Sequence, residues 1–226
     1  MSKTIPMLFN SDMVLALLQG RKTQTRRPVK PQPTSEHSWR GWIMESSNRK
    51  YEGCASWEIS RLNNYIYAKP PCAVGDLIYV RETHHTSHAG KTIYRADFDV
   101  NPFGEECGDD CSMFGEKWIP SIHMPRNASR ITLKVTGVRV ERIKDISRTD
   151  ALAEGIDRWD DTFSITPYRN YLTSASLHFS IPECSFISLW GATYGAKSVD
   201  ENCWVWVIEF EVIKQNVDAY LLENKE

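Results

Sequence analysis

The segment 129–143, SRITLKVTGVRVERI, constrains the fold most because apolar and polar residues alternate along its first half. The apolar positions of this alternation are Ile131, Leu133 and Val135. Successive side chains of a β-strand point to opposite faces of a sheet, so a period of two predicts a half-buried strand. Gly137 interrupts the pattern and predicts a bulge or a bend within this strand.

Three further segments have the composition of strands. The run 204–212, WVWVIEFEV, alternates apolar residues with glutamates toward its end and predicts a second long strand. Residues 77–82 follow a turn at 74–76, and residues 91–96 carry a similar mixture of aliphatic and aromatic residues. The sequence therefore predicts at least four strands.

Capping residues and apolar spacing predict three helices. The predicted limits are Ser11-Asp12 to Gly20, Ser147 to Gly155, and residues 183–193. In the second helix Asp150 follows the N-cap serine by three residues, which is the spacing of a capping box. Glycine ends the first two helices because it adopts the left-handed conformation without steric cost.

Many strands without regularly alternating helices predict an α+β fold, with a small antiparallel or mixed β-barrel and short helices at its rim. The sequence has no Rossmann glycine fingerprint, no P-loop and no serine nucleophile elbow. The commonest nucleotide-dependent and hydrolase classes are therefore excluded.

The 226 residues carry a formal net charge of −2, which speaks against an ordinary, strongly basic nucleic-acid-binding domain. The charges are unevenly distributed, however. Residues 1–50 contain nine Lys and Arg against three acids, and residues 126–148 contain seven against two, whereas residues 97–116 contain seven acids and no Lys or Arg. We therefore expect a basic face together with an acidic loop that lies away from it or covers it.

The sequence predicts a cytoplasmic protein without a metal or other cofactor. It has no apolar segment of signal-peptide or membrane-spanning length. The potential metal ligands are Cys107, Cys111, His84, His85 and His88. They lack the two matched short spacings that a zinc site requires, and scattered cysteines in a reducing compartment remain free thiols.

Five segments together resemble one family. They are Gly20–Lys30 (GRKTQTRRPVK), Val74–Thr83 (VGDLIYVRET), Pro120–Ile143, Ile146–Ile156 (ISRTDALAEGI) and Trp204–Glu211. In this order the chain resembles ASCH-domain proteins, specifically the larger versions found in bacteriophages and prophages. The resemblance implies a PUA-like β-barrel, a fold shared with domains that bind RNA or modified bases.

The resemblance also implies a domain organisation. It predicts a single ASCH domain over residues 1–213, with a C-terminal tail at 214–226. Long insertions are expected at about 28–60, 97–117 and 157–181, where the chain exceeds the smaller members of the family.

The resemblance further implies a reaction. In the small bacterial branch that hydrolyses N4-acetylcytidine, a Lys and a Thr of the G-R-K-T-x-T block act with a Glu of a later helix, and the matching residues are Lys22, Thr25 and Glu154. A threonine hydroxyl needs an adjacent base to act as a nucleophile. Lysine serves as that base only when its pKa is lowered, and the neighbouring arginines favour this.

Five arginines are candidates for contact with the substrate or with nucleic acid because guanidinium groups suit phosphate. They are Arg21, Arg26, Arg81, Arg126 and Arg130. His123 is a further candidate because it is expected to line the same cleft. The expected partner is a nucleoside or RNA, or single-stranded DNA, in the cytoplasm of a bacterial host, with no membrane. Two alternatives to amide hydrolysis stay open, namely a non-catalytic regulator that binds RNA or a modified base, and a ribonuclease that uses the same cleft.

Overall fold

The computed structural model describes residues 2–59, 64–87, 90–100, 118–158, 165–173 and 178–224. The chain divides into two compact units, each built from separated segments. Unit 1 comprises Met1–Thr23, Gly75–Val135 and Phe210–Glu226, and unit 2 comprises Gln24–Val74 and Thr136–Glu209. The predictions for most of the acidic loop and for His88, Cys107 and Cys111 fall outside the described residues.

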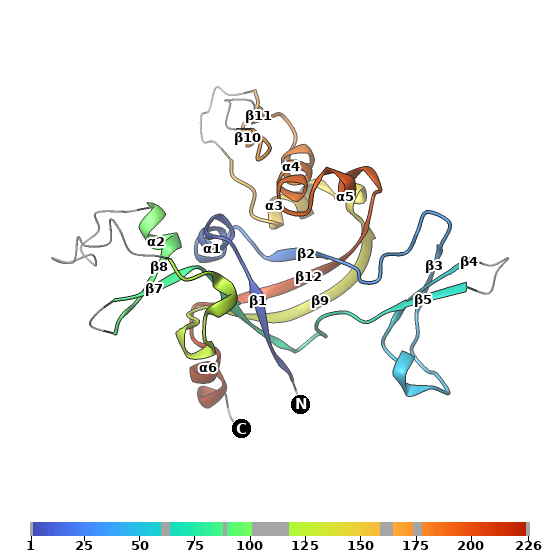
Figure 1. The fold of residues 1–226 in the computed structure, drawn as a ribbon, viewed down its shortest axis with the longest axis horizontal. Coiled ribbons are helices and arrows are strands. Elements are labelled where there is room, and N and C mark those ends of the chain that lie inside the picture. Colours follow the sequence, from blue (N-terminus) through green and yellow to red (C-terminus); the bar gives the residue numbers. More distant parts are fainter. Residues whose placement is uncertain are drawn as a thin grey trace. The chain divides into compact units, whose positions relative to one another are not determined.

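Unit 1 combines helices with two sheets (Figure 1). Its elements are β1 (Thr4–Leu8), α1 (Ser11–Leu18), β6 (Leu77–Arg81), β7 (His84–Thr86), β8 (Thr92–Tyr94), α2 (Arg95–Val100), η4 (Ser121–His123), η5 (Arg126–Ala128), the start of β9 (Thr132–Arg142), the end of β12 (Trp204–Ile213) and α6 (Val217–Glu223). The strand order of its main sheet is β1-β6-β9-β12, and β7 pairs with β8. Strand β1 runs parallel to β6, and β6 runs antiparallel to β9.

Helix α1 begins and ends through its capping residues. The side chain of Asn10 accepts a hydrogen bond from Met13 N at 2.9 Å, so the N-cap is Asn10 and not the predicted Ser11-Asp12 pair. Asparagine is as good an N-cap as serine or aspartate, which explains the displacement by one residue. At the other end Gly20 has a φ of 74°, as predicted for a C-terminal glycine.

The C-terminal segment of unit 1 forms helix α6, where the sequence indicates a polar tail or a frayed helix. Asn216 caps the helix by accepting a hydrogen bond from Asp218 N at 2.9 Å. Its amide group also donates to the carbonyl oxygens of Arg126 and Ser129, at 3.0 and 2.7 Å. Because Val217 is fully buried, the segment is held by packing as well as by hydrogen bonds.

Unit 2 also contains several sheets (Figure 1). Its elements are β2 (Gln24–Pro28), β3 (Ser38–Trp42), η1 (Arg49–Tyr51), β4 (Ala55–Ile59), β5 (Asn64–Ala68), most of β9, η6 (Ile143–Asp145), α3 (Arg148–Ala153), β10 (Tyr168–Arg169), β11 (His178–Phe179), α4 (Pro182–Tyr194), α5 (Ala196–Asp200) and most of β12. One sheet has the order β9-β12-β2, with β2 as an outer strand, and a second has the order β3-β4-β5. Strands β10 and β11 form a two-stranded sheet.

Tryptophans fill the interior between β12 and the β3–β5 sheet within unit 2. Trp39 and Trp57 lie 5.0 Å apart between ring centroids, and Trp57 and Trp204 lie 5.6 Å apart in an edge-to-face arrangement. Trp42 and Trp206 approach to 5.8 Å. Such aromatic pairs stabilise a fold beyond the area that they bury. Trp39 and Trp42 keep more than a third of their surface exposed, so the cluster also reaches the solvent.

Gly137, predicted to mark a bulge or bend, lies inside β9 where the side chain of Glu209 crosses it. A Cβ atom at this position would lie 2.6 Å from the Glu209 Oε2 atom. A larger residue at this position would therefore require the Glu209 carboxylate of β12 to move aside.

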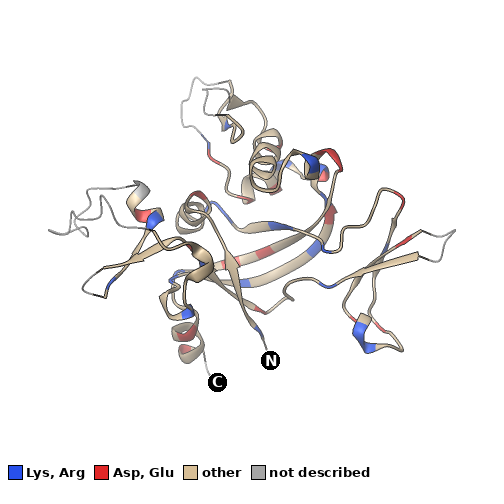
Figure 2. Ribbon diagram, viewed as in Figure 1, with Lys and Arg blue, Asp and Glu red and all other residues tan. Residues whose placement is uncertain are grey.

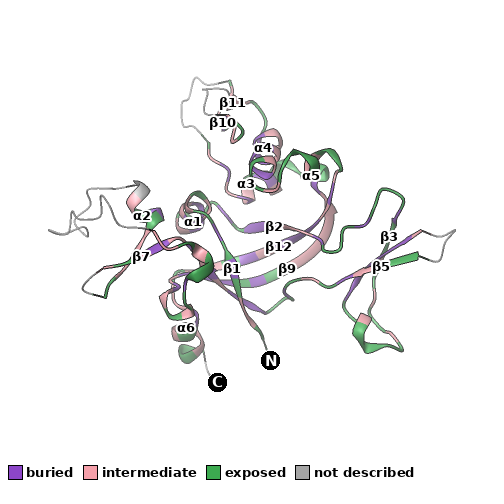
Figure 3. Ribbon diagram, in the orientation of Figure 1, coloured by how far each residue is buried: buried purple, intermediate pink, exposed green. Residues whose placement is uncertain are grey.

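The fold is mixed α+β with several sheets, which confirms the predicted class. Within the described residues the sheet orders are open and do not close into a barrel. Buried residues are concentrated in the first part of β2, the first residues of β9, most of β12 and α4, whereas the rest of β9 is half-buried, as Figure 3 shows. No helix in the described part of the chain has both the length and the apolarity needed to cross a bilayer.

Candidate functional site

A buried arginine at the centre of unit 2 contacts three carboxylates. The side chain of Arg26 has no exposed surface, and its guanidinium group lies 3.1 Å from Glu154 Oε1, 2.9 Å from Glu141 Oε2 and 3.2 Å from Asp150 Oδ2. The ring of Phe186 lies 5.5 Å from the guanidinium carbon. Charged groups are fully buried only when they are paired, so these contacts are what allow Arg26 to lie inside the protein.

Strand β2 positions Arg26. It pairs antiparallel with β12, so that Arg26 lies opposite Val207 and Thr25 lies opposite Ile208. Gln24 and Arg26 point to the same face, where the Gln24 amide donates to Asp150 O at 3.0 Å. Since side chains alternate along a strand, Thr25 points to the opposite face of β2.

Helix α3 supplies two of the carboxylates. The Ser147 hydroxyl accepts a hydrogen bond from Asp150 N at 3.1 Å, so Ser147 is the N-cap, as predicted. Residues four apart share one side of a helix, which brings Asp150 and Glu154 to the same guanidinium group. Glu154 is the C-cap residue, and the following Gly155 adopts a φ of 80° that ends the helix at the predicted place.

A second arginine extends the network. Arg139 on β9 donates to Glu141 Oε1 at 2.6 Å and to Asp150 Oδ2 at 2.8 Å, and it also bonds to Glu209 Oε1. Arg26 and Arg139 therefore share Glu141 and Asp150. Figure 2 shows the basic and acidic positions interspersed along β2, β9 and β12. We call Arg26, Arg139, Glu141, Asp150, Glu154 and Glu209 the Arg26 cluster.

The network holds the pKa of Asp150 below its ordinary value. Burial of this carboxyl acts to raise the pKa, but the charges of Arg139 and Arg26 and the hydrogen bonds from Arg139 and Ser147 together outweigh it. A carboxylate whose pKa is lower in the folded state stabilises the fold above its unfolded pKa, and this contribution is lost as the pH falls through the folded pKa.

We therefore expect Asp150→Asn to lower the free energy of unfolding by about 1 kcal/mol at pH 7 and to have little effect near pH 2. Urea unfolding of the wild-type protein and the variant at both pH values measures this difference. Asp145→Asn, at an exposed carboxylate near the same helix, is the control and should match the wild type at both. An equal cost of Asp150→Asn at both pH values would contradict the assignment.

Lys22, expected to act as the base, belongs to unit 1 and is fully buried. Its backbone N–H and that of Arg21 both donate to Ala16 O, at 3.1 and 2.9 Å, in the turn that follows Gly20. A lysine within a sequence segment rich in Lys and Arg is normally exposed to solvent. Burying an ammonium group costs several kcal/mol unless it is compensated, so the burial of Lys22 sets it apart from its neighbour Arg21, which is exposed.

Two of the predicted contact residues, Arg81 and His123, lie near each other in unit 1. The guanidinium group of Arg81 donates to Met124 O at 2.8 Å and to Ile122 O, so it fastens the segment that carries the exposed His123. The Arg81 guanidinium group is therefore engaged by backbone carbonyl oxygens of this segment, which compete with a phosphate for its donors.

Arg126 and Arg130, also in unit 1, are bound to acidic side chains. Arg126 makes two hydrogen bonds to Asp218 of α6. Arg130 contacts Glu82 through two atoms at 2.9 and 3.0 Å and reaches Asp97 at 2.6 Å. Burial raises the pKa of Glu82, and its hydrogen bond from Arg130 acts in the opposite direction. These ion pairs offset the positive charge expected around Arg130.

Of the candidate metal ligands, His84 is buried, and burial lowers its pKa despite its contact with Glu82 O. Among the described residues no group of three or more His, Cys, Asp or Glu side chains is placed to hold a metal ion.

Comparison of the chain with models of protein families, with curated proteins and with solved structures gives no match. The resemblance to ASCH-domain proteins, and the phage or prophage origin that it implies, therefore stay predictions. The case for a function rests on the residues themselves.

The structure thus brings Arg26 and Glu154 into direct contact, whereas sequence reasoning assigned them separate roles. It also adds three residues that sequence reasoning missed, namely Arg139, Glu141 and Asp150 as charged partners. A signal existed in the alternation V-R-V-E-R of residues 138–142, which places Arg139 and Glu141 on one face of a strand.

Proposed function

We propose that this protein is an ASCH-type, PUA-like protein that binds a nucleoside or RNA and hydrolyses the N4-acyl bond of acylated cytidine. One observation carries the proposal. Lys22, Thr25 and Glu154, the residues that the resemblance assigns to the reaction, are each buried to 97% or more, although lysine and glutamate usually lie at the surface. Buried charged residues are concentrated at functional sites.

In the proposed reaction the Thr25 hydroxyl attacks the acyl carbonyl while Lys22 accepts its proton, and Glu154 protonates the leaving N4 atom. Water then hydrolyses the acyl-threonine, so that acylated cytidine and water yield cytidine and a carboxylic acid. Strand β2 is the outer strand of its sheet. Because Thr25 points to the face of β2 opposite to Arg26 and Glu154, the proposed reaction requires the substrate to bind across the free edge of this strand.

Arg26 supports the proposal through Glu154. Its hydrogen bond fixes one oxygen of the Glu154 carboxylate at 3.1 Å. The other oxygen is the one proposed to receive the proton that Lys22 takes from Thr25 and to pass it to the leaving N4 atom, so that a fixed carboxylate relays this proton at a defined position. Because Arg26 is buried among acids, we assign it to positioning Glu154 and not to phosphate binding.

The test is incubation of the purified full-length protein with N4-acetylcytidine, followed by chromatography of cytidine and enzymatic assay of acetate. We expect equal amounts of both products without added metal. Absence of turnover with N4-acetylcytidine and with acetylated RNA would refute the catalytic part of the proposal.

A second candidate function, RNA binding without catalysis, is favoured by the tryptophan cluster of unit 2. Exposed Trp39 and Trp42 offer ring faces on which bases stack, and Arg142 lies 4.3 Å from the centre of the Trp204 ring. We expect single-stranded RNA to bind more weakly as salt rises and to lose about tenfold in affinity with Trp39→Ala. Ser38→Ala, next to it on β3, is the control. Fluorescence anisotropy measures both, and affinity unchanged by Trp39→Ala would exclude this surface.

A further inference from the structure

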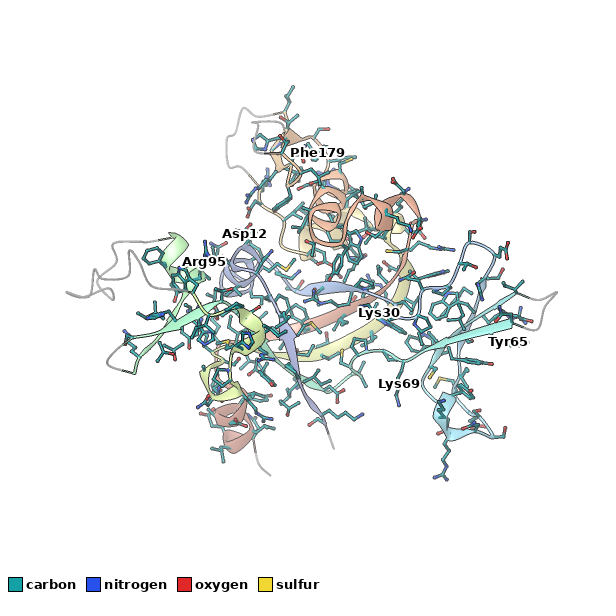
Figure 4. All side chains as sticks on the ribbon, viewed as in Figure 1. Asp12, Lys30, Tyr65, Lys69, Arg95 and Phe179 are labelled. Atoms are coloured by element: carbon teal, nitrogen blue, oxygen red, sulfur yellow. The ribbon has the colours of Figure 1, made fainter. Side chains whose placement is uncertain are left out.

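Unit 2 contains a pocket with a volume of about 470 Å³ beside α4 and α5. Its walls are largely apolar and come from Ile146, Leu172, Phe179, Ile187 and Val199. Phe179, labelled in Figure 4, lies on β11 next to α4. Sites for small molecules have volumes of roughly 300–1,000 Å³ and mostly apolar walls, so the pocket has the size and lining of such a site.

A glycine of α4 forms part of the pocket wall. Gly191 lies in the last turn of this helix, three residues before Tyr194. A Cβ atom at this position would lie 3.6 Å from Leu172 and 3.8 Å from Val199, both of which line the pocket. A larger side chain at position 191 would therefore occupy the space between them.

The pocket offers one unused hydrogen-bond acceptor among the described residues. Glu183 lines it, and the Oε2 atom of this residue is buried without a hydrogen-bond partner. The hydroxyl of Ser188, also at the wall, donates to Ser185 O at 2.7 Å and accepts from Tyr171 N at 3.0 Å. A buried carboxylate oxygen left unpaired is costly, and rotation of the Glu183 side chain toward a ligand that donates to it removes that cost.

We propose that this pocket binds a small molecule in which an apolar body carries one protonated amine, with the amine at Glu183. The exposed side chains of Lys144 and Asp200 at the edge of the pocket have opposite charges, so Glu183 sets the charge preference. Nucleobases carry ring-nitrogen and carbonyl acceptors that the apolar walls would leave unpaired, so they are expected not to bind here. The inference is independent of the proposed hydrolase function.

The first test compares three probes with the same apolar body: phenylbutylamine, phenylbutanol and phenylbutyrate. Isothermal titration calorimetry with the full chain should show the amine binding at least about tenfold more tightly than the alcohol, since hydrogen bonds to a charged group are the stronger ones. The carboxylate should not bind. Equal affinity of the amine and the carboxylate would overturn the proposal.

Two variants locate the probe. Glu183→Gln should reduce the affinity for the amine to that for the alcohol and leave the alcohol unchanged, and Gly191→Leu should abolish binding of both. Glu201→Gln, an exposed glutamate next to α5, is the matched control and should bind as the wild type does. Unchanged amine binding in Glu183→Gln would refute the role of Glu183.

Cys184 provides a readout that does not depend on the Gly191 variant folding. This free thiol lines the pocket and is partly exposed, whereas Cys54 is a buried free thiol outside it. Iodoacetamide labelling of the wild-type protein, followed by mass spectrometry of the two peptides, should show that phenylbutylamine slows labelling at Cys184 severalfold. Labelling at Cys184 that stays unaffected at saturating amine would overturn the proposal.

Discussion

Replacement of Arg26 by alanine is expected to lower the free energy of unfolding by about 3–5 kcal/mol, because it removes the buried cation that contacts Glu141, Asp150 and Glu154 and leaves Arg139 to compensate only the first two. All three contacts come from a guanidinium group with no exposed surface. Urea unfolding followed by circular dichroism at pH 7 measures the change. Arg49→Ala, at an exposed arginine of the same unit, should change stability by no more than about 0.5 kcal/mol.

The same variant should regain stability when the carboxylates lose their charge. A second substitution, Asp150→Asn or Glu154→Gln, is expected to cost less in the Arg26→Ala background than in the wild type, because each removes a negative charge that Arg26 had compensated. Additive effects in this double-mutant cycle, or a loss below about 1 kcal/mol for Arg26→Ala itself, would show that the cluster does not depend on Arg26.

Replacement of Lys22 by methionine is expected to lower the turnover of N4-acetylcytidine by at least about a thousandfold, since it removes the proposed base and keeps most of the apolar stem. Methionine suits a fully buried position, so the fold should persist. Lys30→Met is the matched control, at an exposed lysine eight positions further along the chain, and should keep wild-type turnover. Turnover by Lys22→Met within tenfold of the wild type would exclude Lys22 as the base.

Thr25→Val tests the nucleophile in the same assay. Valine has the shape of threonine without the hydroxyl, so the variant removes only the attacking atom at this buried strand position. We expect loss of turnover with the substrate still bound. Full turnover would show that water attacks the substrate directly and that Thr25 is a packing residue.

Local patterns predicted the elements that depend on neighbouring residues. The alternation of apolar and polar residues predicted β9 and β12. Ser147 correctly predicted where α3 begins, and Gly20 correctly predicted where α1 ends. Each of these signals lies within a few positions of the element that it predicts, so no distant contact was needed to interpret it.

Elements that depend on distant partners were missed. Strand β1 is a short segment containing Pro6, and it is a strand because it pairs parallel with β6, some seventy residues away. The β3–β5 sheet lies largely in residues 28–60, where the resemblance implied a long insertion and no strand was predicted. The β3–β5 sheet contains the fully buried Trp57, which packs against Trp204 of β12, a residue far away in the sequence.

Burial of charged residues at the candidate site could not be predicted from composition. Arginine and glutamate normally indicate an exposed position, and their burial here is stabilised by pairing between residues far apart in the sequence, such as Arg26 and Glu154, which are separated by 128 positions. The family resemblance pointed to Glu154, but it gave no indication of Glu141 or Asp150, which complete the network.

The chain passes between the two units four times, and β9 and β12 each contribute residues to both. Neither unit is therefore a contiguous stretch of gene. Recombination at a single junction cannot transfer one unit to another protein, and no simple truncation can yield one alone. Expression of the Arg26 cluster without the segment that carries Lys22 would need residues 24–74 and 136–209 to be joined by a new linker.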